Sequence, residues 1–260
     1  MTFPHASAAA GRLEVSASTG STNADLLAHA DDAENWPHLS VIVTRDQRAG
    51  RGRLDRQWVA PAGSALAVSV LLRAGEVPVA ERGWIPLAAG AAMADAIAAQ
   101  LPHVEVAVKW PNDVLVRGAD DAERKICGIL AEARGADVVV VGTGINTAMT
   151  AEQLPVSTAT SFAVEGVECD EDLLVAGYLV RLDAHLTGLV EHGSAVASGL
   201  RDVVAVRCST IGRTVRVQLP GGSELVGAAT GLAADGCLVV RDADGEHPVA
   251  AGDVVHVRPA

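Results

Sequence analysis

The sequence is poor in lysine. Only two of its 260 residues are lysines, Lys109 and Lys125, whereas it has eighteen arginines. A genome whose base composition favours arginine codons explains such a skew. A lysine retained against that bias indicates a position where a planar guanidinium does not replace a compact ammonium group. The two lysines are therefore the first candidate functional residues.

Other absences exclude whole classes of protein. The four cysteines are widely spaced without a C-x-x-C pair, so we expect reduced thiols and no structural metal site. The longest apolar runs, 65–72 and 84–94, are shorter than the roughly 18 residues that cross a bilayer, and the first residues lack a signal-peptide pattern. We therefore expect a cytoplasmic protein.

Positive charge is scarce overall but locally concentrated. A formal net charge of −12 argues against a protein that coats nucleic acid. Residues 44–58 nevertheless carry five arginines and two aspartates. Glycines in this segment allow the backbone to approach a ligand closely, and arginines bind phosphate or carboxylate oxygens. The segment is either an anion-binding loop or a solvated polar loop.

Apolar periodicity predicts an α+β fold. Helices are expected after Ser21, over 85–101 and after Asp170; strands are expected at 39–44, 64–72, 104–108, 125–132 and 138–141. The acidic stretch 118–123 is expected to be an exposed loop between two strands. Because helices and strands do not alternate strictly, we expect a mixed β-sheet with flanking helices rather than a doubly wound parallel sheet.

The pattern changes after Cys208. Apolar and polar residues then alternate, and turn pairs such as 221–222 and 235–236 separate short apolar runs. A series of hairpins without a helix predicts a small β-barrel. We therefore divide the chain into a main domain, residues 1–207, and a C-terminal β-barrel, residues 208–260.

Several catalytic motifs are absent. The chain contains no G-x-x-x-x-G-K-[ST] loop, no H-E-x-x-H helix and no G-x-S-x-G turn. Gly142 and Gly144 follow an apolar run, but Thr147 stands where a third glycine is needed, and no helix pattern begins there. A dinucleotide-binding fingerprint is therefore excluded.

Five short segments remain as candidate sites. They are Ser21-Thr-Asn23, Gln47 to Trp58, Lys109-Trp-Pro-Asn-Asp113, Lys125 to Glu132 and Gly142 to Asn146. Both lysines lie in them, and so do three of the four asparagines, whose amides offer a donor and an acceptor to an uncharged polar ligand. A turn at the end of a strand accounts for Pro111 to Asp113, but not for Lys109 and Trp110.

In order and spacing, the five segments resemble biotin protein ligase over residues 13–150. The most specific are Ala49-Gly-Arg-Gly-Arg53 and Lys109-Trp-Pro-Asn-Asp113. The resemblance implies the biotin and lipoate ligase fold, which is similar to class II aminoacyl-tRNA synthetases, with an SH3-like C-terminal barrel. It also implies a monofunctional ligase without a DNA-binding domain. Such a ligase converts biotin and ATP, accompanied by Mg²⁺, into biotinoyl-5′-adenylate and pyrophosphate, and then transfers biotin to a lysine.

The resemblance also implies partners and site residues. The acceptor is a biotin carboxyl carrier protein domain of an acyl-CoA carboxylase, neither DNA nor a membrane is an expected partner, and the protein is a monomer or a ligand-dependent homodimer. The implied catalytic residues are Lys125, Arg53 and Lys109, which offset the charge that builds as two anions approach. The implied biotin site comprises Ser21, Thr22, Asn23, Gln47, Arg51, Gly52, Arg53, Lys125 and Gly128. The implied nucleotide site comprises Arg51, Arg53, Trp58, Lys109, Asn112, Asp113 and Asn146, with Trp58 covering the adenine.

This chain departs from the family at Leu54 and Asp55, where relatives often carry basic residues or glycine, and in the acidic insertion 118–123. The segment 44–58 is expected to be mobile until a ligand binds, because its glycines and arginines bury little. Two alternatives stay open: a lipoate or octanoate ligase or transferase of the related fold, and a non-catalytic biotin sensor. The arginine-rich loop and the polar set around Asn23 speak against an alkyl pocket.

Overall fold

The computed structural model describes residues 2–54, 56–118, 120–219, 222–250 and 253–256. Asp55, Ala119 and Gly221, which the sequence places in loops and a turn, lie outside the described residues, as does the end of the expected C-terminal domain.

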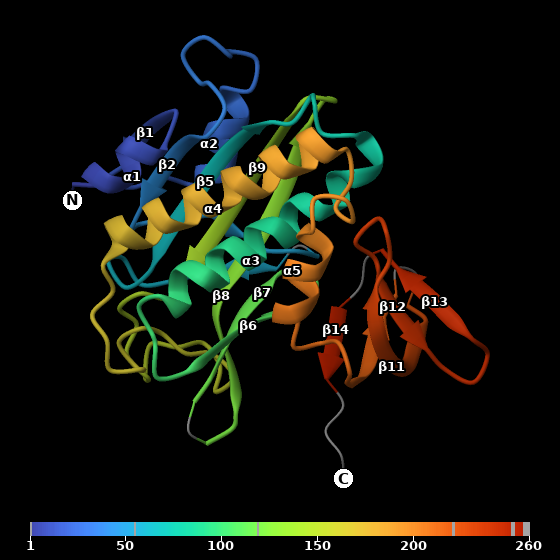
Figure 1. Ribbon diagram of the computed structural model, residues 1–260. Coiled ribbons are helices and arrows are strands. Elements are labelled where there is room, and N and C mark those ends of the chain that lie inside the picture. The colour runs from blue at the N-terminus through green and yellow to red at the C-terminus, as the bar shows by residue number, and fades with distance from the viewer. Residues whose placement is uncertain (1, 55, 119, 220–221, 251–252, 257–260) are drawn as a thin grey trace.

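A seven-stranded mixed sheet forms the centre of the larger part of the molecule (Figure 1). From edge to edge it consists of β1 (Arg12–Val15), β2 (Ser40–Thr44), β5 (Leu66–Arg73), β9 (Val138–Ile145), β8 (Glu123–Arg134), β7 (Asp113–Arg117) and β6 (Glu105–Lys109). β1 and β2 are parallel, and the other neighbours are antiparallel. β2 and β5 are buried along almost their whole length, as expected where a sheet is covered on both faces.

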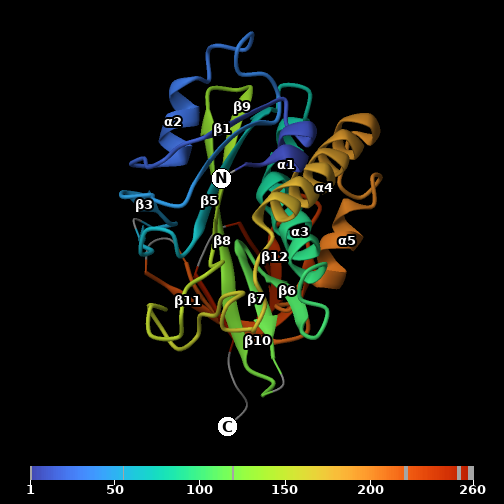
Figure 2. The same ribbon diagram turned by 90° about the vertical axis from the view of Figure 1, so that its left-hand side faces the viewer.

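Helices cover both faces of this sheet (Figure 2). One face carries α1 (Pro4–Ala9), α3 (Ile85–Ala98), α4 (Glu171–His192) and α5 (Leu200–Arg207), and the other carries α2 (Thr22–Ala28). α4 begins at the N-cap Asp170, whose carboxylate accepts a hydrogen bond from the Leu173 amide, and ends at Gly193 in a left-handed conformation. By length and composition α4 could cross a membrane, but here it packs on α1 and α3 as a core helix does.

The predicted helices are confirmed as α2, α3 and α4, and the predicted strands as β2, β5, β6, β8 and β9. The acidic stretch connects β7 to β8, with Glu123 already part of β8. The sequence patterns do not predict α1, β1, β7 or α5. β7 is only five residues long and follows Pro111 and Asn112, whose turn character dominates the local pattern.

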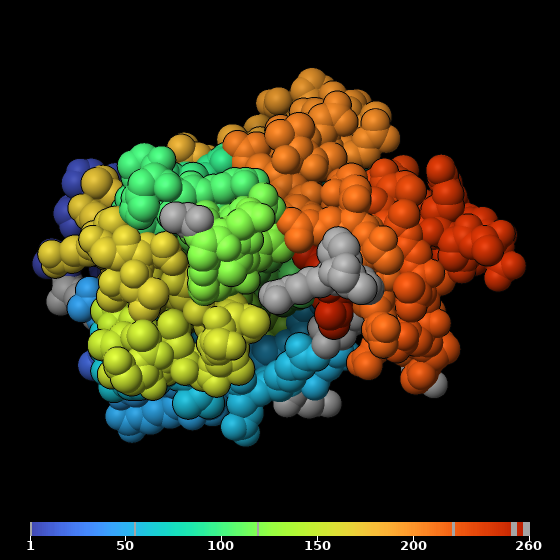
Figure 3. Space-filling view, turned by 90° about the horizontal axis from the view of Figure 1, so that it is seen from below, coloured from blue at the N-terminus to red at the C-terminus, as the bar shows by residue number. Residues whose placement is uncertain are grey.

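A five-stranded antiparallel sheet follows α5. Its order is β13 (Glu246–Val249), β12 (Leu238–Arg241), β11 (Glu224–Leu232), β10 (Thr214–Gln218) and β14 (Asp253–His256). Its surface lies directly beside the larger domain when seen from below (Figure 3).

Two buried tryptophans fasten this C-terminal sheet to the larger domain. The indole N–H of Trp84 donates to Ala234 O at 2.8 Å, and that of Trp110 donates to Gly236 O at 3.1 Å. Both acceptors lie in the turn between β11 and β12. Trp110 belongs to the Lys109-Trp-Pro-Asn-Asp113 segment, but its role is structural, because it holds the C-terminal sheet to the larger domain.

Candidate active site

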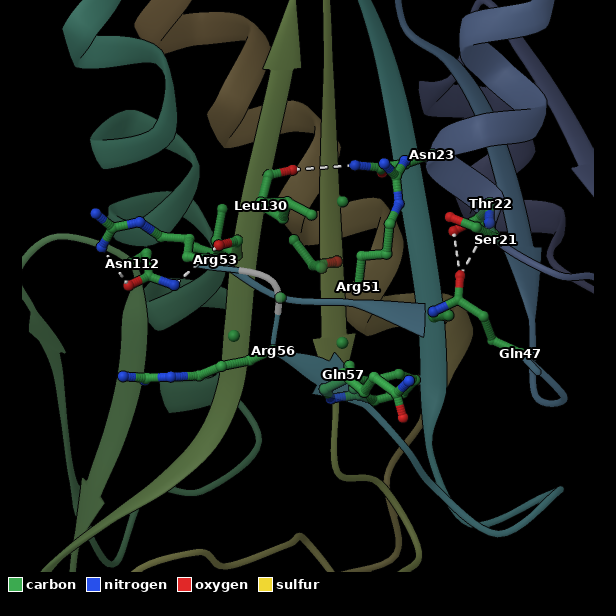
Figure 4. A pocket seen from close by; sticks show the side chains of 18 of the residues that line it. Ser21, Thr22, Asn23, Gln47, Arg51, Arg53, Arg56, Gln57, Asn112 and Leu130 are labelled. Carbon is green, nitrogen blue, oxygen red and sulfur yellow. Dashed lines mark hydrogen bonds between the residues drawn. The ribbon is translucent and has the colours of Figure 1, made fainter. Parts of the chain in front are cut away.

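A cavity of about 180 Å³ lies over β5, β9 and β8 on the face of the sheet that carries α2 (Figure 4). A short hairpin, β3 (Gly50–Arg51) with β4 (Gln57–Trp58), lines its outer side. Twelve of the expected site residues line it: Ser21, Thr22, Asn23, Gln47, Arg51, Gly52, Arg53, Trp58, Asn112, Asp113, Lys125 and Gly128. Segments far apart in the sequence thus meet in one cavity.

At one end of the cavity, uncharged polar side chains from α2 and from the start of the arginine-rich segment line the wall. Ser21 is the N-cap of α2, and its hydroxyl accepts a hydrogen bond from the Ala24 amide at 3.4 Å. The next residue, Thr22, donates to Gln47 Oε1 from both its amide at 2.9 Å and its hydroxyl at 3.0 Å. The first turn of α2 and the start of the arginine-rich segment are therefore joined at this end (Figure 4).

Asn23 lies beside this pair with every amide hydrogen engaged. Its Nδ2 donates to Glu132 Oε2 at 2.8 Å and to Leu130 O at 3.2 Å, and its Oδ1 accepts from Ser69 Oγ at 2.6 Å. Sequence reasoning missed Ser69 and did not assign Glu132 a role. A serine within the otherwise apolar run of β5 is the signal that could have found the first.

Two glycines of β9 make room for side chains above the sheet. A Cβ atom at Gly142 would overlap the amide of Asn23, and one at Gly144 would lie 2.5 Å from Trp58 Cε2. Glycine is required at both positions because other side chains already occupy the space. The two glycines that resemble part of a dinucleotide fingerprint therefore serve a different purpose: they leave space above β9 for the side chains of Asn23 and Trp58.

An ion pair lies farther along the cavity. Lys125 Nζ is 2.5 Å from Asp113 Oδ1, and the two side chains are 40% and 23% exposed. Asp113 and Gly128 are paired across β7 and β8, and a Cβ atom at Gly128 would lie 2.9 Å from Lys125 Nζ. The lysine therefore reaches the carboxylate by lying against the bare backbone of its own strand.

Two arginines attach the outer hairpin and its loop to the large sheet, one directly at β8 and one through Asn112, which precedes β7. Arg51 donates to Glu132 Oε2 at 3.0 Å, and Arg53 donates to Asn112 Oδ1 at 3.2 Å. The Asn112 amide in turn donates to Ile129 O at 3.0 Å. These contacts place two guanidinium groups at the mouth of the cavity, where they can bind an anion.

Two expected site residues do not line this cavity. Lys109 faces a neighbouring cavity of about 1030 Å³, which also includes Asp113 and Lys125 and is bounded by the C-terminal sheet. The Asn146 side chain is 9% exposed and donates to Thr160 O at 2.9 Å, so it supports the loop that follows β9.

Among the described residues, the cysteine nearest the ion pair in sequence is unreactive. Cys127 lies one residue from Gly128 and is buried, and burial raises the pKa of its thiol to about 12. A thiol with such a pKa carries almost no thiolate near neutral pH and does not attack a substrate. Cys127 is therefore not the nucleophile of this site, although the charged groups of the cavity can bind and polarise a ligand.

Comparisons with known proteins agree over most of the chain. Residues 15–146 match the biotin/lipoate A/B protein ligase family, and residues 210–257 match the biotin protein ligase C terminal domain. The chain is 40% identical over 250 residues to the biotin--[acetyl-CoA-carboxylase] ligase of Mycobacterium tuberculosis, covering 95% of this chain and 90% of that one. It is 31% identical to the ligase of the same name from Paracoccus denitrificans, covering 92% and 98%.

A solved structure shows the same fold. The biotin protein ligase from Aquifex aeolicus in complex with biotin and ATP superposes with a TM-score of 0.75 at 23% sequence identity. The superposition covers 96% of this chain and 100% of the other. The mixed sheet and the C-terminal sheet therefore occur together in both proteins.

Proposed function

Because the chain belongs to the biotin/lipoate A/B protein ligase family, we propose that the cavity under the β3–β4 hairpin is where it joins biotin to ATP. The enzyme activates biotin as biotinoyl-5′-adenylate and transfers it to a lysine of a biotin carboxyl carrier protein. The residues of the cavity explain how each substrate is held.

The uncharged end of the cavity matches the ureido ring of biotin, which has two N–H donors and one carbonyl acceptor. Ser21 accepts from Ala24 and keeps its O–H for a ligand. Gln47 uses its oxygen for Thr22 and keeps its Nε2 as a donor. The Asn23 oxygen keeps one lone pair after bonding to its neighbour in β5. The unused groups thus include two donors for the ring carbonyl and an acceptor for a ring N–H.

Lys125 is the group that supports adenylation. The biotin carboxylate must approach the α-phosphate of ATP, and both are anions. An ammonium held 2.5 Å from Asp113 is preorganised, and it stabilises the charge that builds as the two anions meet. The substrate carboxylate is the nucleophile, which agrees with the inert Cys127 thiol. Arg53 at the mouth of the cavity contributes a second cation.

The nucleotide lies toward the hairpin. Arg51, Arg53 and Asn112 offer donors to the phosphates and ribose, and the Trp58 indole covers the adenine ring. ATP enters as its magnesium complex. Lys109 contributes from the adjoining cavity, which meets the first at Lys125 and opens a route for the pyrophosphate that leaves.

The chain has further expected properties that belong to this proposal. Residues 1–207 form the catalytic domain and residues 208–260 the C-terminal domain, which the two separate family matches support. The enzyme works in the cytoplasm, as a monomer or a ligand-dependent homodimer, on the biotin carrier of an acyl-CoA carboxylase and without binding DNA or membranes.

The observation that carries the proposal is one cavity with an uncharged polar end and a Lys125–Asp113 pair. The test is pyrophosphate release from Mg·ATP with biotin, lipoate, octanoate or no acid added. We expect release only with biotin. Release that is faster with lipoate or octanoate would instead favour the related acyl ligases, and biotin binding without release would favour a sensor.

A further inference from the structure

Three groups hold the Asn23 amide in place, and none of them belongs to an expected site residue. Glu132 and the Leu130 carbonyl lie on its nitrogen side, at 2.8 Å and 3.2 Å, and the Ser69 hydroxyl lies on its oxygen side at 2.6 Å. Asn23 is 5% exposed and Ser69 is fully buried. Water therefore does not replace these partners if one of them is lost.

Reversing the amide would break both bonds on its nitrogen side. Its oxygen would then face the Glu132 carboxylate and the Leu130 carbonyl, which are acceptors. The Ser69 hydroxyl tolerates either orientation, because it can accept from an amide nitrogen while it donates to Thr22 at 2.6 Å. Buried polar groups without partners are costly, so the amide remains as it is. In this orientation both amide hydrogens are used and one lone pair of Oδ1 is left for a ligand.

We infer that Glu132 is a positioning residue that selects biotin, because it fixes the Asn23 amide with its remaining acceptor available to a ring N–H. The inference rests on the proposed function and extends it to the choice of acid. A ureido ring supplies the N–H, whereas the dithiolane ring of lipoate has none and leaves the acceptor unpaired. A site that bonds a polar group discriminates strongly against an analogue that lacks it.

Glu132 also reaches the outer hairpin. The same Oε2 that accepts from Asn23 accepts from Arg51 at 3.0 Å, and the carboxylate is 23% exposed. The amide at the biotin end and an arginine at the mouth of the cavity therefore share one acceptor atom. Glutamine at this position can still present an oxygen to Asn23, but it loses the charge that attracts Arg51.

The test compares Glu132→Ala, Glu132→Gln and Ser69→Ala in the full chain. Biotin affinity is measured by calorimetry, and pyrophosphate release is measured with biotin and with lipoate. We expect Glu132→Ala and Ser69→Ala to weaken biotin binding about tenfold or more, and Glu132→Gln by no more than about threefold. At saturating biotin and Mg·ATP, kcat should stay within about threefold, because neither Glu132 nor Ser69 touches the reacting atoms.

The preference for biotin over lipoate in kcat/KM should fall by a similar factor in Glu132→Ala. Asp31→Ala is the matched control, because it removes an exposed carboxylate that pairs at 2.7 Å with Arg134, which lies on β8 as Glu132 does. This variant should change neither the affinity for biotin nor the preference for biotin over lipoate. The inference is overturned if Glu132→Ala binds biotin as the unaltered enzyme does, or if Glu132→Gln is as weak as Glu132→Ala. If the unaltered enzyme itself does not bind biotin, the proposed function fails as well.

Discussion

Replacing Lys125 with alanine removes the ammonium group at the centre of the proposed adenylation site. In the free protein this group pairs with Asp113 at 2.5 Å. We expect the pair to be exchanged for the two substrate anions during adenylation. The loss of one preorganised electrostatic donor typically lowers kcat by roughly two to three decades, or about 3–4 kcal/mol of transition-state stabilisation.

The same change should affect stability far less. The two side chains are 40% and 23% exposed, and ion pairs with this much solvent contribute about 0.2–1 kcal/mol. For a chain of this size that corresponds to a fall in Tm of at most about 4 °C. A large loss of rate with a small loss of Tm therefore separates catalysis from folding.

Arginine should not rescue the activity fully. Lys125 lies against the backbone at Gly128, where even a Cβ atom would be 2.9 Å from the ammonium. A planar guanidinium is larger than the ammonium group and spreads its charge over a different geometry, so we expect Lys125→Arg to remain at least about tenfold slower than the unaltered enzyme.

The assay is pyrophosphate release at saturating biotin and Mg·ATP, with thermal unfolding in parallel. Arg134→Ala is the matched control, because it removes a cation from the same strand that is 49% exposed and pairs with Asp31. Lys125→Ala that keeps more than about a tenth of the normal rate would refute this role for the ammonium group.

Three other substitutions and reactions test separate features. Gly144→Ala places a methyl group 2.5 Å from Trp58 Cε2, so we expect the KM for ATP to rise about tenfold in steady-state kinetics while the KM for biotin changes little; an unaltered KM for ATP would show that the indole does not cover the nucleotide. Burial raises the pKa of Cys127 to about 12, so a thiol reagent at pH 8 should label this residue only after unfolding, as read by peptide mass spectrometry; rapid labelling of the native protein would contradict its burial. Trp84→Phe removes the N–H that donates to Ala234 O at 2.8 Å, and we expect urea denaturation to show a loss of about 1–3 kcal/mol; undiminished stability would mean that this contact does not fasten the C-terminal sheet.

Much of the fold could be predicted because its central elements are long and apolar. α3 and β5 carry buried residues almost throughout, and such runs are visible without tertiary information. β7 could not be predicted, because five residues after a turn gain their strand conformation from pairing with β6 and β8 on either side.

Candidate site residues could be predicted where they lie in distinctive sequence segments. They could not be predicted where the pairing of distant strands brings them to the cavity. Ser69 and Glu132 contact Asn23 because β5 and β8 both flank β9, a pairing that no local pattern reveals. Lys109 lies on the edge strand β6, two strands from β8, which is why it reaches the adjoining cavity instead. Spacing along the chain does not show which of two neighbouring cavities a side chain faces.

The most direct measurement is a single-turnover reaction with ATP labelled at the α-phosphate. We expect a labelled biotinoyl-adenylate to form only when biotin is present, and the label to leave as AMP when a biotin carboxyl carrier domain is added and becomes biotinylated on lysine. A folded protein that binds biotin and ATP but forms no adenylate, or that forms one with lipoate in preference to biotin, would contradict the proposed role of this cavity.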